Sequence, residues 1–189
     1  MQKTFGAVAA LGEPLRPKTL GSVLRTSESD GRAHLDQLHL VVRVPATNEA
    51  PIRLFHASFR DFLFDARRCV DAEFCMDKRF VHQQLLEACI AAMATCLKRD
   101  ICGLRKPIVG VAEVDKVRIN ECIPEHVRYA CRYWVEHLKL ARASTTYVLV
   151  FLQKYLLDWW DTMSLMERLS GRLRMLNDLQ QFVKVSLPP

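Results

Sequence analysis

From Lys78 to the end of the chain, apolar residues recur three and four positions apart, which is the spacing of one face of a helix. The clearest stripe in this part of the sequence consists of Leu86, Cys89, Ile90, Met93, Cys96, Leu97 and Ile101. It predicts a helix of about 26 residues from Asp77 to Cys102, with the Asp77 carboxylate as its N-cap. Helices with such stripes must bury them against one another. The sequence therefore predicts a mainly α protein with an α-helical bundle over residues 77–189.

Further helices are expected after this one. The segment 124–140 begins with Pro124 and Glu125, which are favoured in the first turn of a helix. The next helix is expected to begin at Ser144 or Thr145, with an apolar stripe that includes Leu152, Leu156 and Trp159. One broken or two short terminal helices follow, with Gly171 as the expected break. A weaker helix is predicted over residues 111–122. Most aromatic residues fall on the apolar stripes, but Tyr133 and Trp160 lie partly off them and are candidates for an interface.

The N-terminal part of the chain mixes helical and β patterns. Residues 16–24 and 32–40 each predict about two helical turns, and the β-rich runs 39–44 and 52–55 flank the loop "PATNEAP". A helix is expected to begin near Ala57. Two helices, a hairpin and a helix predict a winged-helix-like domain over residues 1–66. Residues 67–76 have no clean periodicity and are interpreted as a connector to the helical domain of residues 77–189.

The cysteines argue against disulfides and against a metal site. There are seven, an odd number, and no C-x-x-C motif occurs, so free thiols in a reducing compartment are expected. Cys75, His82, Cys89 and Cys96 are spaced seven apart, which on a helix sets neighbours about 10 Å from each other. One zinc ion cannot gather such ligands. No metal is therefore expected. No apolar run approaches the length of roughly 18 residues that a membrane span needs, and this favours a cytoplasmic protein.

The sequence shows no known catalytic signature. The 189 residues contain no G-x-x-x-x-G-K-[ST], G-x-S-x-G, H-E-x-x-H or G-x-G-x-x-G motif, so no catalytic residue is predicted. The 27 Lys and Arg residues exceed the 21 Asp and Glu residues by 6, but they are scattered along the chain. The excess of positive charge permits nucleic-acid binding by a winged helix, which is kept as the alternative function. The scatter of the basic residues does not favour it.

His56 holds a special position within "PIRLFHASFRDFLFD", at the end of a predicted strand and just before a helix. The N-terminus of a helix carries positive potential and favours anions, so an imidazole there is able to donate a hydrogen bond to a phosphate. The ordinary alternatives are that His56 caps the helix or packs in a groove. The sequence pattern leaves these alternatives open.

Several runs occur together in this chain: "IRLFHASFRDFL", "RRCVDAEFCMD", "VHQQLLEACIAAM", "LKRDICGL", "IPEHVRYACRYWVEHL" and "VFLQKYLLDWW…SLMERLS". In these runs the sequence resembles fungal NACHT-type signal-transducing (STAND) NTPases, which include NOD-like receptors and vegetative incompatibility proteins. The resemblance covers roughly residues 10–185. It corresponds to the winged-helix domain and the helical region C-terminal to the nucleotide-binding core.

The resemblance implies a role for His56. In that family a histidine at the end of the wing strand touches the β-phosphate of bound ADP, so His56 matches a nucleotide-phosphate sensor that is vestigial here. Plant relatives follow this histidine with aspartate, whereas this chain has Ala57. The phosphate-binding loop and the magnesium-binding acidic residues of the family have no counterpart in the sequence.

The resemblance further implies a truncated family member that acts as a non-enzymatic regulatory or interaction module. No cofactor is expected, and ADP or ATP would bind only where another chain supplies a nucleotide-binding domain. The expected partner is a protein, such as a NACHT nucleotide-binding domain or a full-length relative. Phe55, Phe59 and Phe62, or the surface of the helices within residues 125–160, are expected to supply the contact. The least favoured interpretation is an incomplete NTPase.

Overall fold

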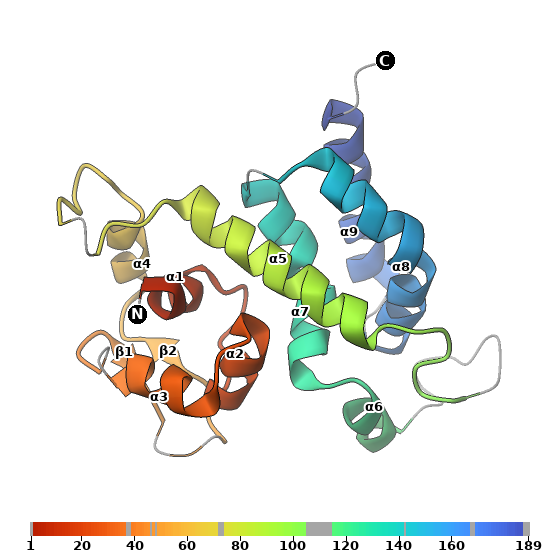
Figure 1. Ribbon diagram of the computed structural model, residues 1–189, viewed down its shortest axis with the longest axis horizontal. Coiled ribbons are helices and arrows are strands. Elements are labelled where there is room, and N and C mark those ends of the chain that lie inside the picture. Colours follow the sequence, from red (N-terminus) through yellow and green to blue (C-terminus); the bar gives the residue numbers. More distant parts are fainter. Residues whose placement is uncertain are drawn as a thin grey trace. The chain divides into compact units, whose positions relative to one another are not determined.

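A computed structural model describes residues 2–36, 39–45, 47, 49–71, 74–104, 115–141, 143–166 and 169–186. These residues form nine helices and one two-stranded antiparallel sheet (Figure 1). The chain divides into two compact units between Ala88 and Cys89, and the second unit holds most of the chain from Cys89 onward. The prediction of a mainly α fold with a small β-hairpin is confirmed.

The first unit contains a hairpin set among short helices. Its elements are α1 (Gln2–Ala10), α2 (Pro17–Leu24), α3 (Glu28–Asp36), β1 (Val42–Arg43), β2 (Arg53–Leu54), α4 (Ala57–Leu63) and the first part of α5 (Lys78–Cys96). In the hairpin Val42 pairs with Leu54 and Arg43 with Arg53. The Ile52 amide donates to the Leu15 carbonyl at 2.8 Å, which ties the start of β2 to the segment before α2. The hairpin is thereby held against the helices.

Helix α1 was not among the predicted elements. Apart from Gln2, Lys3 and Thr4 in its first turn its residues are apolar, and the helix is buried from Thr4 to Ala10. A helix that is buried all round has no polar face and thus no helical periodicity to read. Gly6 allows α1 to lie close to the segment that leads into α5, because a Cβ atom at Gly6 would stand 2.9 Å from Val81 and 3.0 Å from Met76.

Helix α3 begins earlier than the predicted segment 32–40. The Ser27 hydroxyl accepts a hydrogen bond from the Asp30 amide at 3.1 Å and donates to the Asp30 carboxylate at 2.6 Å. This arrangement is close to a capping box, with Asp in place of the usual Glu or Gln. The spacing of Ser27 and Asp30 is visible in the sequence, so the true start of α3 was readable from it.

Helix α5 is shorter than predicted. It begins as expected, because the Asp77 carboxylate accepts from the amides of Arg79 at 2.8 Å and Phe80 at 3.3 Å. It ends at Cys96 rather than Cys102. Asp100 and Gly103 have φ angles of 51° and 62°, and a left-handed residue such as Asp100 prevents the helix from continuing to Cys102. The segment "GLRKPIVG" (103–110), whose glycines and proline predict a break in the helix, lies mostly outside the described residues.

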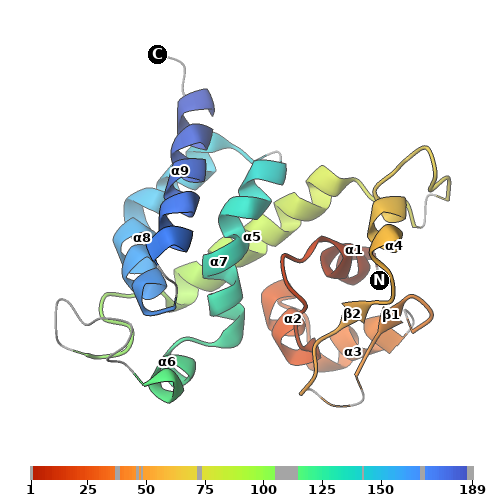
Figure 2. The same cartoon turned by 180° about the vertical axis from the view of Figure 1, so that it is seen from behind.

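The second unit is a group of helices around two tryptophans. It contains the rest of α5, α6 (Lys116–Cys122), α7 (Glu125–Leu140), α8 (Thr145–Met166) and α9 (Leu169–Ser186), of which α6 to α9 are labelled in Figure 2. The rings of Trp134 and Trp159 meet edge to face at 5.4 Å. The Trp159 indole N–H donates to the Cys131 carbonyl at 3.1 Å. Helix α8 is thus joined to α7 by the packing of two buried rings and by a hydrogen bond that satisfies the indole nitrogen of Trp159.

Three details of the helical prediction are corrected by the structure. Gly171 lies inside α9 and does not break it, and a glycine costs little so close to the start of a helix. Leu156, assigned to the buried stripe of α8, is exposed, whereas Thr162 and Met163 are buried. Helix α6 covers only Lys116–Cys122 of the predicted segment 111–122, with Asp115 as its N-cap, and residues 111–114 lie outside the described residues.

The two interface candidates are half-buried. The Tyr133 ring lies 4.9 Å from that of Tyr129, and the Arg172 guanidinium lies 5.0 Å from the centre of a Trp160 ring. Both side chains therefore make contacts within the second unit, and their role in binding a partner remains a prediction.

Trp159→Ala is expected to lower the free energy of unfolding by about 3–5 kcal/mol, because it removes a buried ring and a hydrogen bond. Trp159 is 1% exposed. Trp160→Ala is the matched control, since the neighbouring ring is only half-buried, and it should cost less than about half as much. Urea unfolding followed by circular dichroism measures both. Equal losses would contradict this account of the core.

Candidate functional site

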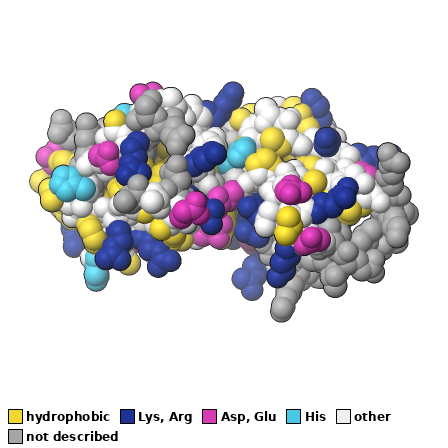
Figure 3. All heavy atoms as spheres, turned by 90° about the horizontal axis from the view of Figure 1, so that it is seen from below, with side chains coloured by type: hydrophobic (Ala, Val, Ile, Leu, Met, Phe, Trp, Pro, Cys, Tyr) yellow, Lys and Arg dark blue, Asp and Glu magenta, His cyan; other side chains and the backbone are white. Residues whose placement is uncertain are grey.

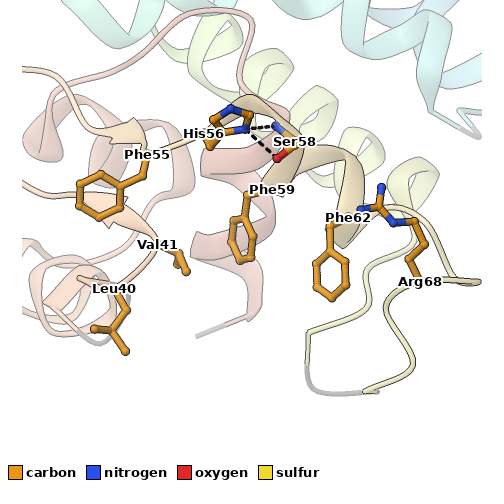
Figure 4. A pocket seen from close by; sticks show the side chains of 8 residues that line it. All are labelled: Leu40, Val41, Phe55, His56, Ser58, Phe59, Phe62 and Arg68. Atoms are coloured by element: carbon orange, nitrogen blue, oxygen red, sulfur yellow. Dashed lines mark hydrogen bonds between the residues drawn. The ribbon is translucent and has the colours of Figure 1, made fainter.

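His56 is the N-cap of α4. Its backbone is extended, with φ −145° and ψ 140°, and its Nδ1 accepts a hydrogen bond from the Ser58 amide at 3.1 Å (Figure 4). The Ser58 hydroxyl oxygen also lies 2.7 Å from Nδ1. A backbone amide can only donate, so Nδ1 must be unprotonated when the cap is formed. The neutral ring then carries its proton on Nε2, as a donor that the cap does not use.

An open pocket of about 310 Å³ lies beside His56 (Figure 4). It is lined from four parts of the first unit: Leu40 and Val41 before β1, Phe55 and His56 after β2, Ser58, Phe59 and Phe62 on α4, and Arg68 beyond α4. The three phenylalanine side chains project to the same side of the chain in Figure 4. The pocket is therefore mainly apolar with two basic groups among its lining residues.

The aromatic side chains of the pocket are only partly packed. Phe59 contacts Phe5 with ring centres 5.7 Å apart, and Phe62 with centres 6.1 Å apart. The Arg68 guanidinium lies 6.0 Å from the centre of the Phe62 ring. Phe55 is 58% exposed and Leu40 is 78% exposed. The pocket thus places apolar surface in contact with water.

The apolar stripe of α4 is less buried than its spacing suggests. Phe59, Phe62, Leu63 and Ala66 recur at helical positions, but only Leu63 is fully buried and Ala66 is exposed. The helix has seven residues and presents a narrow face to the core. Phe59 and Phe62 are half-buried and turn toward the pocket instead. The sequence named Phe55, Phe59 and Phe62 as contact residues, but it gave no signal for Leu40, Val41 or Arg68.

Two other histidines are buried structural residues. His137 is fully buried, and its Nε2 lies 2.9 Å from the Tyr129 hydroxyl. His82 is buried in the first unit, where burial lowers its pKa to about 4, with smaller contributions from Lys78 and Arg60. Each has a polar neighbour in the sequence, Gln83 beside His82 and Glu136 beside His137. Their positions on apolar stripes, three or four residues from buried leucines or a buried tryptophan, were the signal for burial.

The cysteines have free thiols, as expected. Burial raises the pKa of Cys131 to about 12 and also raises that of Cys89. Such thiols remain protonated and are poor nucleophiles. Among the residues that the structure describes, no group of three or more His, Cys, Asp or Glu side chains is arranged to hold a metal ion.

The surface charges do not gather on the face drawn in Figure 3, where Lys and Arg side chains are interspersed with Asp and Glu. In the described part of the chain, no helix has both the length and the apolar character that a membrane span requires.

Comparisons with protein families, curated proteins and solved structures find no match for this chain. The resemblance to NACHT proteins therefore rests on the sequence runs alone.

His56→Ala is expected to lower the free energy of unfolding by about 1 kcal/mol, because the Ser58 amide loses its cap. His56→Asn keeps a short side chain that caps helices well and should remain close to the parent protein. The two variants are compared by urea unfolding midpoints. A loss in the alanine variant as large as that from removing a core phenylalanine, about 3–5 kcal/mol, would show that His56 is a packing residue.

The stability of the first unit should fall in acid because of His82. An unfolded histidine takes up a proton near pH 6.5, whereas folded His82 takes one up only near pH 4. Between these values the unfolded chain binds more protons, so the free energy of unfolding decreases as the pH falls from about 6.5 to about 4, by up to about 3 kcal/mol. Below this window the decrease from His82 ends.

The control is His82→Gln, which cannot titrate. Subtracting its unfolding curve at each pH from that of the parent protein removes the contribution of the carboxylates. A difference that does not change between pH 7 and pH 4 would contradict the lowered pKa.

Proposed function

We propose that this chain is a non-enzymatic regulatory or interaction module. In this proposal it corresponds to the winged-helix and helical segment that follows the nucleotide-binding core in fungal NACHT-type NTPases. The observation that carries the proposal is the exposed aromatic pocket beside His56. Phe55 and Leu40 leave apolar surface in water next to a preformed hollow. Exposed apolar surface of this kind is typical of a site where another protein binds.

The order of the elements in the first unit supports the winged-helix part of the proposal. Helices α2 and α3 are followed by the β1–β2 hairpin and then by α4. In this interpretation the loop between the strands is the wing, and His56 stands at the end of the wing strand. This is the position that the family resemblance assigns to the phosphate-contacting histidine.

His56 alone is a weak basis for nucleotide binding. The cap leaves one donor, Nε2–H, and a single hydrogen bond to a charged group contributes about 1.5–3 kcal/mol. Nucleotide sites normally add a cradle of backbone amides, a lysine and a magnesium ion. In the proposal, His56 contacts ADP or ATP only when a nucleotide-binding domain on another chain supplies those groups.

The alternative of nucleic-acid binding has less support. The wing residues 45–51 include no Lys or Arg, and α4 has Arg60 as its one basic residue. DNA-binding winged helices need basic side chains on the helix and wing that meet the phosphates. Surface charge of mixed sign does not provide this.

The test is calorimetric titration of the chain with a purified fungal NACHT nucleotide-binding domain, with ADP present. Saturable binding is expected, and Phe55→Asp should weaken it by at least tenfold, because a carboxylate would be desolvated in the interface. Val185→Asp is the matched control and should leave binding unchanged, since Val185 is also exposed and apolar but lies on α9, outside residues 125–160.

The same calorimeter should detect no saturable binding of ADP by the chain alone. Tight binding of ADP without the second protein, or hydrolysis of ATP that His56→Ala abolishes, would overturn the proposal of a module without its own nucleotide site.

A further inference from the structure

The outward face of the hairpin carries two arginines directly opposite each other. Side chains alternate along a strand, so Val41 and Arg43 share one face of the first strand, and Arg53 and Phe55 share the same face of the second. Arg43 pairs with Arg53, and both are exposed. The Phe55 amide donates to the Val41 carbonyl at 3.1 Å, which continues the pairing to the pocket. Like charges opposite each other are unfavourable for a hairpin unless an anion lies between them.

The other side of the pocket is also basic. Arg68 lines it next to Phe62, and His56 brings an imidazole whose Nε2–H is free of the helix cap. None of the lining residues is acidic. The nearby Asp65 carboxylate accepts a hydrogen bond from the Arg67 amide at 3.0 Å. An apolar hollow therefore lies between an arginine pair on the hairpin and an arginine beyond α4.

We propose that this surface binds an acidic protein segment with one aromatic or large aliphatic anchor. The anchor side chain enters the pocket against Phe55 and Phe59. Carboxylates on one side of the anchor lie against Arg43 and Arg53, and a carboxylate on the other side meets Arg68. This inference rests on the proposed function, because it specifies the chemistry of the segment by which a partner protein would engage the same pocket.

The charges and the pocket together favour this class of ligand. Arginine forms paired hydrogen bonds with carboxylates, and a carboxylate between Arg43 and Arg53 would offset their mutual repulsion. The apolar lining gives an anchor side chain a place to leave water. A ligand with charge alone would leave Phe55 and Leu40 exposed, and one with an anchor alone would leave the arginines without counterions.

The experiment uses fluorescein-labelled peptides of twelve residues and the intact chain, followed by fluorescence anisotropy. The first peptide has a central Trp flanked by Glu and Asp, the second has the same Trp flanked by Lys, and the third is acidic with Ala in place of Trp. Saturable binding is expected for the first peptide, at least tenfold tighter than for either of the others, and it should weaken as salt is raised.

Two variants locate the site. Phe55→Ala and Arg53→Glu should each weaken binding of the acidic Trp peptide by at least tenfold. Arg53→Glu should also improve binding of the Lys-flanked peptide, which a merely damaged fold would not do. Arg174→Glu makes the same charge change on α9, in the second unit, and should leave binding unchanged.

Folding of the Arg53→Glu variant is checked separately. Replacing one of two opposed arginines by Glu creates an attractive pair, so the melting temperature should not decrease. A variant that keeps its melting temperature and loses the acidic peptide supports the site.

Equal binding of the acidic and Lys-flanked peptides, or of the Trp and Ala peptides, would overturn the inference. Tighter binding of a duplex DNA of the same charge would overturn it in favour of a nucleic acid. If a NACHT nucleotide-binding domain binds in a Phe55-dependent manner while no acidic peptide binds, the proposed function stands and the acidic chemistry is wrong. If neither binds, both are wrong.

Discussion

The register of one short hairpin determines which side chains the first unit offers to a partner. Val42 pairs with Leu54, and with Ile52 these residues turn toward the core, where Val42 and Ile52 are almost fully buried. The alternation of the strands then sends Val41, Arg43, Arg53 and Phe55 outward. A slip of one residue in either strand would turn its arginine, Arg43 or Arg53, toward the core, and an unpaired buried charge is too costly to tolerate. The same burial that holds the hairpin in place therefore also sets the proposed binding face.

Helix α4 completes that face through a local interaction and a distant one. The His56 imidazole caps the first turn, and Leu63 anchors the last turn in the core. The Leu63 carbonyl also accepts the Met76 amide at 3.0 Å, which holds the returning chain against the end of α4. With both ends fixed, Phe59 and Phe62 are left half-buried along the pocket. In the proposed contact with a nucleotide phosphate, the same histidine caps the helix through Nδ1 and binds the phosphate through Nε2.

Apart from the start of α3, the sequence predicted the features that depend on neighbouring residues, and it missed those that depend on distant ones. The Asp77 cap, the start of α4 and the hairpin around the Pro/Asn loop follow from local rules, and each is present. Helix α1 was not predicted because its residues from Thr4 onward are buried and leave no polar face that would mark a helical period. The pocket was predictable only in part: its phenylalanines lie close together in sequence, whereas Leu40 and Arg68 reach it through the folded chain. The spacing of apolar residues in the sequence does not indicate contacts between residues so far apart.

The buried thiols of the second unit can be used to detect local unfolding of its helices. Cys89 and Cys131 are enclosed and kept protonated by burial, so an alkylating reagent in solution reaches them only when the helices around them separate. The rate at which these two sulfurs are alkylated therefore measures how often the helical core opens. Partly exposed Cys96, in contrast, is open to alkylation in the closed form. The native cysteines therefore serve as probes of local unfolding, and no label has to be introduced.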